Sequence, residues 1–460
     1  MRFWQSLLIT LLSSTAASPQ PEILTRDVCI LGGGATGTYA AVQLVDRGYS
    51  VAVVEKEARL GGHAHTLHVP TGEWIDYGVG GYFNTTIVRD FFTQLEVPYE
   101  IPVQPTVVTT HVNFRTGETV PPPSPSDEAT AALLRYEAAV QQFAFLSTGI
   151  YDLPDPVPEV LLRPFREFVH TYDLQAALQV IRVWSKPVGD LLEAPALYLI
   201  QDFGISHFNG LRQGPGIRPV NGTEALFRSA ARYLDETDNN ILYQTTVTQA
   251  TRSSRGVELI VQGANGSRTL IRAKKLLIAF PPLLSSLKGF DLTPEEGSLF
   301  SQWSYTAYYA AAINNSGIPD GLSLINTNPT NAPGSLPVLP FQFGIDYSGV
   351  PGLFLTRLVG ASNFTAEDAR QLILDDLMRM RETGTFPIHD KPEIIAFVIH
   401  TPEALTVPVD SVRNGFYRRV YGLQGQQSTY YTGYAFCTDY TPQLWDYTLG
   451  VVDMMVRELG

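Results

Sequence analysis

Residues Asp27 to Gly37 read Asp-Val-Cys-Ile-Leu-Gly-Gly-Gly-Ala-Thr-Gly, and this stretch decides the fold. A short apolar run, Val28 to Leu31, leads into Gly32, Gly34 and Gly37, which have G-x-G-x-x-G spacing. Glycines in this spacing let the backbone turn sharply after a strand and approach a pyrophosphate closely. The stretch therefore predicts a buried strand that ends in a dinucleotide-binding turn.

The residues after the turn complete a β-α-β pattern. Residues Ala35 to Arg47 predict a helix that Gly48 ends, and Val51 to Val54 predict a second buried strand. The helix N-terminus offers free N–H groups and a positive dipole end to a phosphate. Glu55 follows the second strand, 18 residues after Gly37, where a carboxylate can accept a hydrogen bond from a ribose hydroxyl. A glycine-rich loop without a ligand would leave this acid unexplained.

A second glycine pair follows the acid directly. The segment Lys56-Glu57-Ala58-Arg59-Leu60-Gly61-Gly62-His63 continues from the second strand. Gly61 and Gly62 let the chain pass close to a bulky ligand, and the forked donors of Arg59 suit a phosphate. A third glycine-containing segment, Ile75-Asp76-Tyr77-Gly78-Val79-Gly80-Gly81, lies a little further on.

These segments together resemble the flavin amine oxidase superfamily, in which the second strand runs into an acid and then into Arg-x-Gly-Gly against FAD. Segment 75–81 resembles the superfamily's Asp-x-Gly segment beside the flavin. The histidine at position 63, where amine oxidases often carry an arginine, makes this segment resemble the fungal branch of β-cyclopiazonate dehydrogenase-like FAD-dependent oxidoreductases. The resemblance is strong over 26–85, extends to 216–290 and 425–460, and is weak in between. It implies FAD, not NAD, as the cofactor.

The resemblance also implies the fold and the cofactor-binding residues. The fold class is α/β: a Rossmann-type FAD-binding domain of the glutathione-reductase-like, amine oxidase kind, with an interleaved α+β substrate domain. In the superfamily a Val like Val247 touches the adenosine part of FAD through backbone atoms. The candidate cofactor-binding residues are Gly32, Gly34, Gly37, Glu55, Lys56, Arg59, Gly61, Gly62, His63, Gly78, Gly80 and Val247.

Patterns along the chain divide it into segments of three kinds. Residues 127–146 predict a helix, 241–249, 257–261, 276–280 and 430–436 predict strands, and 441–459 predict a closing helix. The expected FAD-binding parts are 18–105, 216–290 and 406–460, with a helical substrate-domain insert at 106–215 and a substrate-domain sheet at 291–405.

The first residues predict entry into the secretory pathway. Arg2 precedes an apolar run, Phe3 to Leu12, that is too short to span a bilayer, and Thr15-Ala16-Ala17 suits a signal peptidase. Residues 1–17 are therefore predicted to be a signal peptide of a secreted protein, and the mature chain is predicted to have no transmembrane helix. N-glycosylation sequons, which suit a secreted glycoprotein, begin at Asn84, Asn221, Asn265, Asn314 and Asn363.

Composition excludes several classes of function. The chain has 460 residues, 44% of them hydrophobic, and a formal charge of −13 without a basic stripe, which argues against a nucleic-acid partner. His63, His65 and His68 are close in sequence, but no Cys pair accompanies them, so no metal site is expected. The chain also lacks the Gly-x-Ser-x-Gly motif of serine hydrolases.

Departures from the superfamily pattern limit the chemistry that the resemblance implies. The lysine that many members hold near the flavin is missing from the stretch Tyr305 to Ala311. We therefore expect an FAD-dependent oxidoreductase that passes a hydride from a hydrophobic small molecule to the flavin, in fungal secondary metabolism. A flavin-dependent double-bond isomerase and an FAD-binding protein without turnover are the alternatives. The sequence assigns no catalytic residue, electron acceptor or oligomeric state.

Two residues are alternative points for covalent attachment of the flavin. His63 has the imidazole that such a link needs, but it directly follows the glycine pair, where a hydrogen bond near the pyrophosphate is the favoured interpretation. Cys437 is the rival, because thioether-linked flavin occurs in monoamine oxidases. Cys29, the other cysteine, lies inside the first strand and reads as a buried structural thiol.

Overall fold

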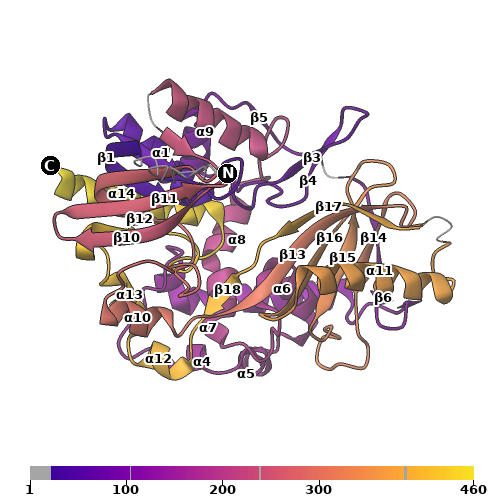
Figure 1. The fold of residues 1–460 in the computed structure, drawn as a ribbon. Helices are drawn as coiled ribbons and strands as arrows, with labels where there is room; N and C mark the ends of the chain where they lie inside the picture. The colour runs from indigo at the N-terminus through magenta and orange to yellow at the C-terminus, as the bar shows by residue number, and fades with distance from the viewer. Residues whose placement is uncertain (1–21, 104, 238–239, 388–390) are drawn as a thin grey trace, which may run out of the picture.

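The computed structural model describes residues 22–103, 105–237, 240–387 and 391–460, which form two lobes, each around a sheet (Figure 1). The expected signal peptide, residues 1–17, lies outside the described residues. Among the described helices, none is long and apolar enough to span a membrane.

The glycine turn lies at the end of a strand inside the first sheet. Strand β1 (Glu22–Leu31) pairs in parallel with β2 (Val51–Val54) on one side and with β12 (Arg268–Ile278) on the other. The strand order is β10-β11-β12-β1-β2-β9, and β19 also pairs with β12. The other strands are β9 (Asn240–Leu242), β10 (Thr245–Ser253), β11 (Gly256–Gly263) and β19 (Thr429–Tyr431).

Both faces of the parallel part of this sheet are covered, as parallel strands require, whereas β10, β11 and β12 pair in antiparallel fashion. Val28 and Ile30 pack into one apolar cluster with the first group of helices, whereas Cys29 and Leu31 face the other lobe's helices. The first group consists of α1 (Ala35–Asp46), α2 (Thr86–Gln94), α9 (Glu224–Glu236) and α14 (Thr441–Leu459). Trp445 of α14 donates its indole N–H to the carbonyl of Ala35 at 3.0 Å, which fixes α14 beside the start of α1.

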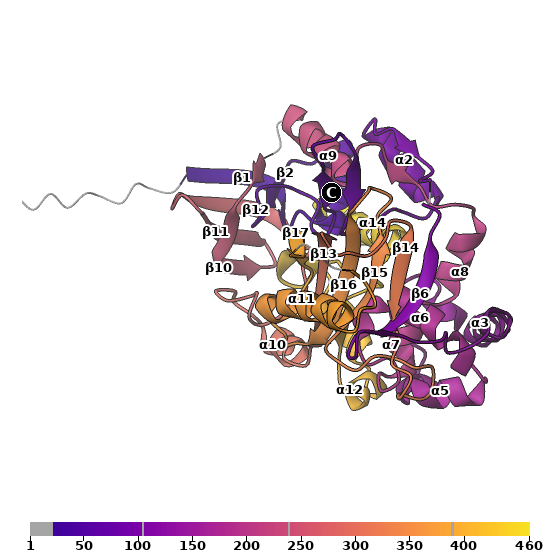
Figure 2. The same cartoon turned by 90° about the vertical axis from the view of Figure 1, so that its right-hand side faces the viewer.

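The second sheet forms one wall of the other lobe. Its order is β17-β13-β16-β15-β14-β6-β7, with β18 paired to β13. Helix α11 (Ala366–Glu382) lies across it, and Ile373 and Leu377 pack into its core (Figure 2). The strands are β6 (Val108–Asn113), β7 (Glu118–Thr119), β13 (Ser304–Asn314), β14 (Leu322–Asn326), β15 (Phe341–Tyr347), β16 (Phe354–Ala361), β17 (Glu393–Ile399) and β18 (Glu403–Thr406).

Short helices fill the space below both sheets (Figure 1). Most come from the segment expected to be a helical insert, although that segment also supplies β6 and β7. They are α3 (Ser126–Val140), η1 (Gln141–Leu146), α4 (Glu159–Leu162), α5 (Phe165–Thr171), η2 (Gln175–Ala177), α6 (Leu178–Trp184), η3 (Lys186–Val188), α7 (Ala196–Asp202), α8 (Ile205–Arg212), α10 (Pro294–Phe300), α12 (Val409–Arg413), α13 (Phe416–Tyr421) and η4 (Gln426–Ser428). Two small ribbons complete the fold, β3 (Thr66–His68) with β4 (Trp74–Asp76) and β5 (Tyr99–Glu100) with β8 (Arg218–Pro219).

Two of the expected strands are wrong in their extent. The run 241–249 is divided between β9 and β10, because Gln244 has a positive φ of 49° and turns the chain from one pairing to another. The run 430–436 contains only the end of β19, because Gly433 has a φ of 110° and begins a turn. Both errors have one cause, since a single left-handed residue ends a strand inside an apolar run.

Candidate functional site

The glycine turn has the geometry that its spacing predicts. Gly32 has a φ of 99°, which favours glycine. A Cβ on Gly37 would lie 1.9 Å from the carbonyl oxygen of Gly32, so only glycine lets α1 pack this close to the strand. Gly32 and Gly37 therefore shape the protein itself.

Gly34 faces open space instead. It is the N-cap residue of α1, no described side chain caps this helix, and no acidic residue lies in its first turn. The only described atom within 4 Å of a Cβ built on Gly34 is the Cα of Gly62, at 3.9 Å. The first N–H groups of a helix have no partner within the helix, and with the positive dipole end they attract an anion. The residues present therefore fit a phosphate at this helix end.

Glu55 holds the glycine turn in place. Its carboxylate is buried and accepts hydrogen bonds from the backbone N–H of Gly33 at 2.6 Å and of Glu57 at 2.7 Å. One bond reaches back to the turn and the other stays in the loop after β2. Each carboxylate oxygen keeps further acceptor capacity, which suits a hydroxyl of a bound ligand.

The second glycine pair lies against the first turn. Gly61 donates its N–H to the carbonyl of Gly33 at 2.8 Å, and Gly61 and Gly62 have φ values of 119° and 51°. Arg59 donates to the carbonyl of Leu60 at 2.9 Å and contacts the ring of His65 at 2.7 Å. These contacts bring the loop 59–62 alongside the N-terminus of α1.

The other predicted cofactor-binding residues differ in how closely they pack on the loop 59–62. Gly78 packs on this loop, because a Cβ there would lie 2.0 Å from the carbonyl oxygen of His63, whereas Gly80 has no described atom within 4 Å of such a Cβ. Val247 is half-buried in β10, two residues after Thr245, whose N–H donates to the carbonyl of Glu55 at 2.9 Å. Lys56 points outward, and its side chain is three-quarters exposed at 75%.

His63 turns toward the second lobe. Its Nδ1 lies 3.1 Å from Oε1 of Glu403, and its ring stacks on His400 with 4.0 Å between the ring centroids. The backbone N–H of His400 donates to the carbonyl of Tyr308 in β13, which fixes this segment to the second sheet. His63 therefore links the glycine-rich loops to the sheet of the other lobe.

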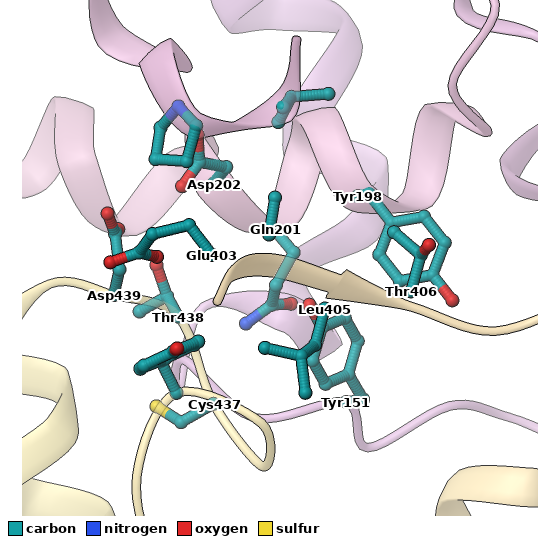
Figure 3. A pocket seen from close by; sticks show the side chains of 14 residues that line it. Tyr151, Tyr198, Gln201, Asp202, Glu403, Leu405, Thr406, Cys437, Thr438 and Asp439 are labelled. Atoms are coloured by element: carbon teal, nitrogen blue, oxygen red, sulfur yellow. The ribbon is translucent and has the colours of Figure 1, made fainter. Parts of the chain in front are cut away.

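A cavity opens beside Glu403, between α7, β18 and the turn that precedes α14 (Figure 3). Its cavity volume is about 40 Å³, and it is partly open to solvent. Apolar and aromatic side chains make up much of its lining, and three carboxylic acids gather on one side. The lining residues are Tyr151, Pro187, Val188, Tyr198, Gln201, Asp202, Glu403, Ala404, Leu405, Thr406, Tyr434, Cys437, Thr438 and Asp439.

The two candidate attachment residues, Cys437 and His63, lie at this cavity and beside it, respectively. Cys437 lines it, and burial raises the pKa of its thiol well above the ordinary value, which keeps the thiolate rare. Cys29 is buried inside β1, and both thiols are free. Within the described residues, no group of three or more His, Cys, Asp or Glu side chains could hold a metal ion.

The polar residues of the cavity carry only weak sequence signals. Asp202 ends an apolar helical run, and Glu403 follows Thr401-Pro402 at the start of a strand. An acid beside so many apolar residues is unusual unless it is paired or functional. This was the available signal, but sequence alone does not show that the acids meet.

Comparison with known proteins places the chain among fungal flavoenzymes. Residues 30–95 match the family model of an NAD(P)-binding Rossmann-like domain. The chain is 39% identical to the beta-cyclopiazonate dehydrogenase of Aspergillus flavus over 95% of its own length and 94% of that protein. It is 33% identical to the FAD-dependent oxidoreductase pigF of Monascus ruber, over 96% of the chain and 94% of that protein.

Solved structures share the fold with much lower sequence identity. A fatty acid isomerase from P. acnes that produces CLA superposes with a TM-score of 0.73 at 17% identity, over 94% of this chain and 98% of that one. Cyclohexylamine oxidase from Brevibacterium oxydans superposes with a TM-score of 0.64 at 19% identity, over 94% and 99%. The expected fold class, a Rossmann-type amine oxidase fold, is confirmed.

Proposed function

The chain belongs to the family of FAD-dependent oxidoreductases that includes beta-cyclopiazonate dehydrogenase, and from that relationship we propose that it dehydrogenates a hydrophobic small molecule of fungal secondary metabolism. The observation that carries the proposal is an uncapped helix N-terminus beside two glycine loops, which His63 joins to Glu403 at the wall of an apolar cavity. Ligand sites of this kind are concave, mostly apolar and have few polar groups.

Each part of the site has a separate task. The N-terminus of α1 and the open faces of Gly34 and Gly62 would hold the pyrophosphate of FAD, and Glu55 would hold the adenosine ribose. When bound, FAD supplies the acceptor for the two electrons and the hydrogen that a substrate loses. The aromatic and apolar walls of the cavity, including Tyr151, Leu405 and Tyr434, exclude water from that substrate.

The test is a comparison of metabolites between a strain that lacks this chain and its parent. We expect the deletion strain to accumulate a hydrophobic compound, and we expect that compound to bleach the flavin of the purified enzyme without oxygen. The product should be lighter by two hydrogens. A product of unchanged mass would contradict dehydrogenation and indicate an isomerase, and an unchanged metabolite profile would contradict the proposed role.

Glu55→Gln should weaken FAD binding and leave the chemical step intact. The amide keeps one acceptor, but its NH₂ group would face either the N–H of Gly33 or that of Glu57, which the carboxylate now accepts. Disturbing a charge-assisted hydrogen bond of this kind costs about 1–3 kcal/mol. FAD affinity, measured by titrating apoprotein, should fall accordingly, and flavin reduction at saturating FAD should stay at the parental rate. Reduction slowed by orders of magnitude with FAD bound would place Glu55 in catalysis.

We also propose that the chain is secreted and glycosylated. The support is the sequence of residues 1–17 and the position of the sequons, since Asn221, Asn265 and Asn363 are exposed, whereas Asn84 and Asn314 are half-buried. The protein from its natural host should begin near Ser18 and lose mass on glycosidase treatment, with glycans at the exposed asparagines. Recovery of Met1 at the N-terminus and an unchanged mass would overturn this proposal.

A further inference from the structure

Three carboxylic acids from distant parts of the chain meet at the cavity. Asp202 is the last residue of α7, Glu403 begins β18, and Asp439 lies just before α14. Figure 3 shows them together on one side of the cavity. Asp202 and Asp439 are close enough to share a hydrogen bond between their carboxyl groups. Two carboxylates this close disfavour a second charge, so a proton on one of the two stabilises the pair.

Several buried polar groups at this cavity have no hydrogen-bond partner among the described residues. Gln201 is buried, and neither atom of its side-chain amide has a hydrogen-bond partner among the described residues. Within the same described part of the chain, Oε2 of Glu403 and Oδ2 of Asp202 are buried without a hydrogen-bond partner as well. A buried polar group that is left unpaired costs free energy, so groups facing one cavity indicate a site for a polar ligand group.

Burial and the nearby helix ends both favour the proton on Asp202 rather than on Asp439. Asp202 lies at the C-terminus of α7, where the negative dipole end disfavours a carboxylate, whereas Asp439 precedes the N-terminus of α14, where the positive end favours one. Burial, followed by the charge of Asp439, raises the pKa of Asp202 well above its usual range. Burial and the charge of Glu403 raise the pKa of Asp439, and the hydrogen bond from Asp202 and the proximity of His63 oppose that rise.

Asp439 is also the acid that a ligand can reach. Asp439 lines the cavity and is exposed, whereas Asp202 is half-buried and Glu403 is buried. Glu403 is held from behind by His63, with 3.1 Å between Oε1 and Nδ1. The remaining titratable groups whose electrostatics couple to Asp439 are Tyr151, Tyr308, Tyr434, Cys437 and Tyr440.

We propose that Asp439 is the catalytic base that takes the proton of the substrate, and that Asp202 and Glu403 are positioning residues that set its charge. This rests on the proposed function. In the step, a substrate C–H bond would break, and FAD, when bound, would accept its hydrogen and electron pair as a two-electron acceptor. The neighbouring O–H or N–H bond breaks and its proton passes to a carboxylate oxygen of Asp439. A double bond forms between the two substrate atoms, so atoms and electrons balance.

The test measures anaerobic flavin reduction in the holoenzyme by the compound that the deletion strain accumulates. Asp439→Asn should retain FAD and slow reduction by on the order of 10²–10⁴-fold, the usual effect of removing a general base. Glu403→Gln removes a charge that raises the pKa of Asp439, so the acid limb of the pH profile should move to lower pH. The exposed Asp410, whose side chain is 86% exposed, provides the control Asp410→Asn, which should leave both rate and profile unchanged.

The outcomes separate this inference from the proposed function. If the compound reduces the parent and Asp439→Asn equally fast, the base assignment is wrong and the proposed function stands. A parent whose flavin is not reduced contradicts both. Should Asp439→Asn lose FAD, the pH profile of Glu403→Gln decides, and an unmoved acid limb would overturn the inference.

An infrared measurement on resting holoenzyme tests the shared proton without substrate. The difference spectrum between the parent and Asp202→Asn at neutral pH should show a protonated carboxyl that the variant has lost. An identical carboxyl region in the two proteins would overturn the inference, because both aspartates would then be ionised.

Discussion

Replacing Gly34 by valine is expected to give a folded protein that contains no FAD. Gly34 has φ −71° and ψ −168°, an extended backbone that valine adopts without strain. A Cβ there meets only the Cα of Gly62 at 3.9 Å, so the side chain would fill open space and not clash with the protein. That space is where the pyrophosphate would approach the N-terminus of α1, and a branched side chain would exclude it.

Two other glycines provide the controls for this variant. Gly450 is exposed in α14 with no described atom within 4 Å of a Cβ, so Gly450→Val should keep FAD. Gly37→Ala should instead destabilise the fold, because its Cβ would lie 1.9 Å from the carbonyl oxygen of Gly32. Flavin absorbance and thermal unfolding measured on all three distinguish the roles. Stoichiometric FAD in Gly34→Val would contradict the placement of the cofactor.

Replacing Arg252 by methionine is expected to lower the free energy of unfolding by about 3–5 kcal/mol, the cost of leaving a buried charge unpaired. The side chain of Arg252 is fully buried and donates to both carboxylate oxygens of Glu296, at 2.7 and 2.8 Å, and to Asp291 at 2.8 Å. It joins β10 to α10. Without it, the carboxylate of Glu296 would stay buried with Tyr431 and the backbone of Thr293 as its remaining donors.

Arg272→Met provides a matched control in the same sheet. Arg272 pairs with Glu258 at 2.9 Å, but both side chains are about half exposed (51% and 55%), and such pairs contribute only about 0–1 kcal/mol. Denaturant unfolding of the two variants measures the difference. Equal losses would contradict the assignment of a buried ionic cluster at Arg252.

Lowering the pH should reduce the difference in the free energy of unfolding between the parent and Arg252→Met. Burial alone raises the pKa of Glu296, but hydrogen bonds from Arg252, Tyr431 and the backbone of Thr293 outweigh it and lower the pKa from 4.5 to about 2. A carboxyl with a lowered pKa in the folded state stabilises the fold above its unfolded pKa, and this contribution is lost as the pH falls. The destabilisation by Arg252→Met should therefore be largest above about pH 4.5 and shrink toward pH 2.

Local pattern was enough to predict the glycine turn and the elements that flank it. The residues of the glycine turn, the helix after it and β2 are contiguous in sequence, and the closing helix 441–459 matches α14 in the structure. Their glycines and apolar periods reflect backbone geometry within a few residues. The partner of Glu55 was missed, because the bond to Gly33 depends on how the loop folds back onto the turn.

The cavity was beyond the reach of sequence reasoning because its acids are distant in the chain. Asp202, Glu403 and Asp439 come from α7, β18 and the turn before α14, and they meet only when the helical segment packs below both sheets. The ion pair between Arg252 and Glu296 could not be predicted either, because a pair between a strand and a later helix leaves no periodic signal in the sequence.

The absorption spectrum of the purified chain, followed by identification of the cofactor after denaturation, tests the central claim most directly. We expect flavin bands in the folded protein and FAD, stoichiometric with the chain, in the supernatant, because the thiol of Cys437 is buried and His63 is engaged by Glu403 and His400. A folded, colourless protein that binds NADH would contradict the claim that this chain is an FAD-dependent oxidoreductase.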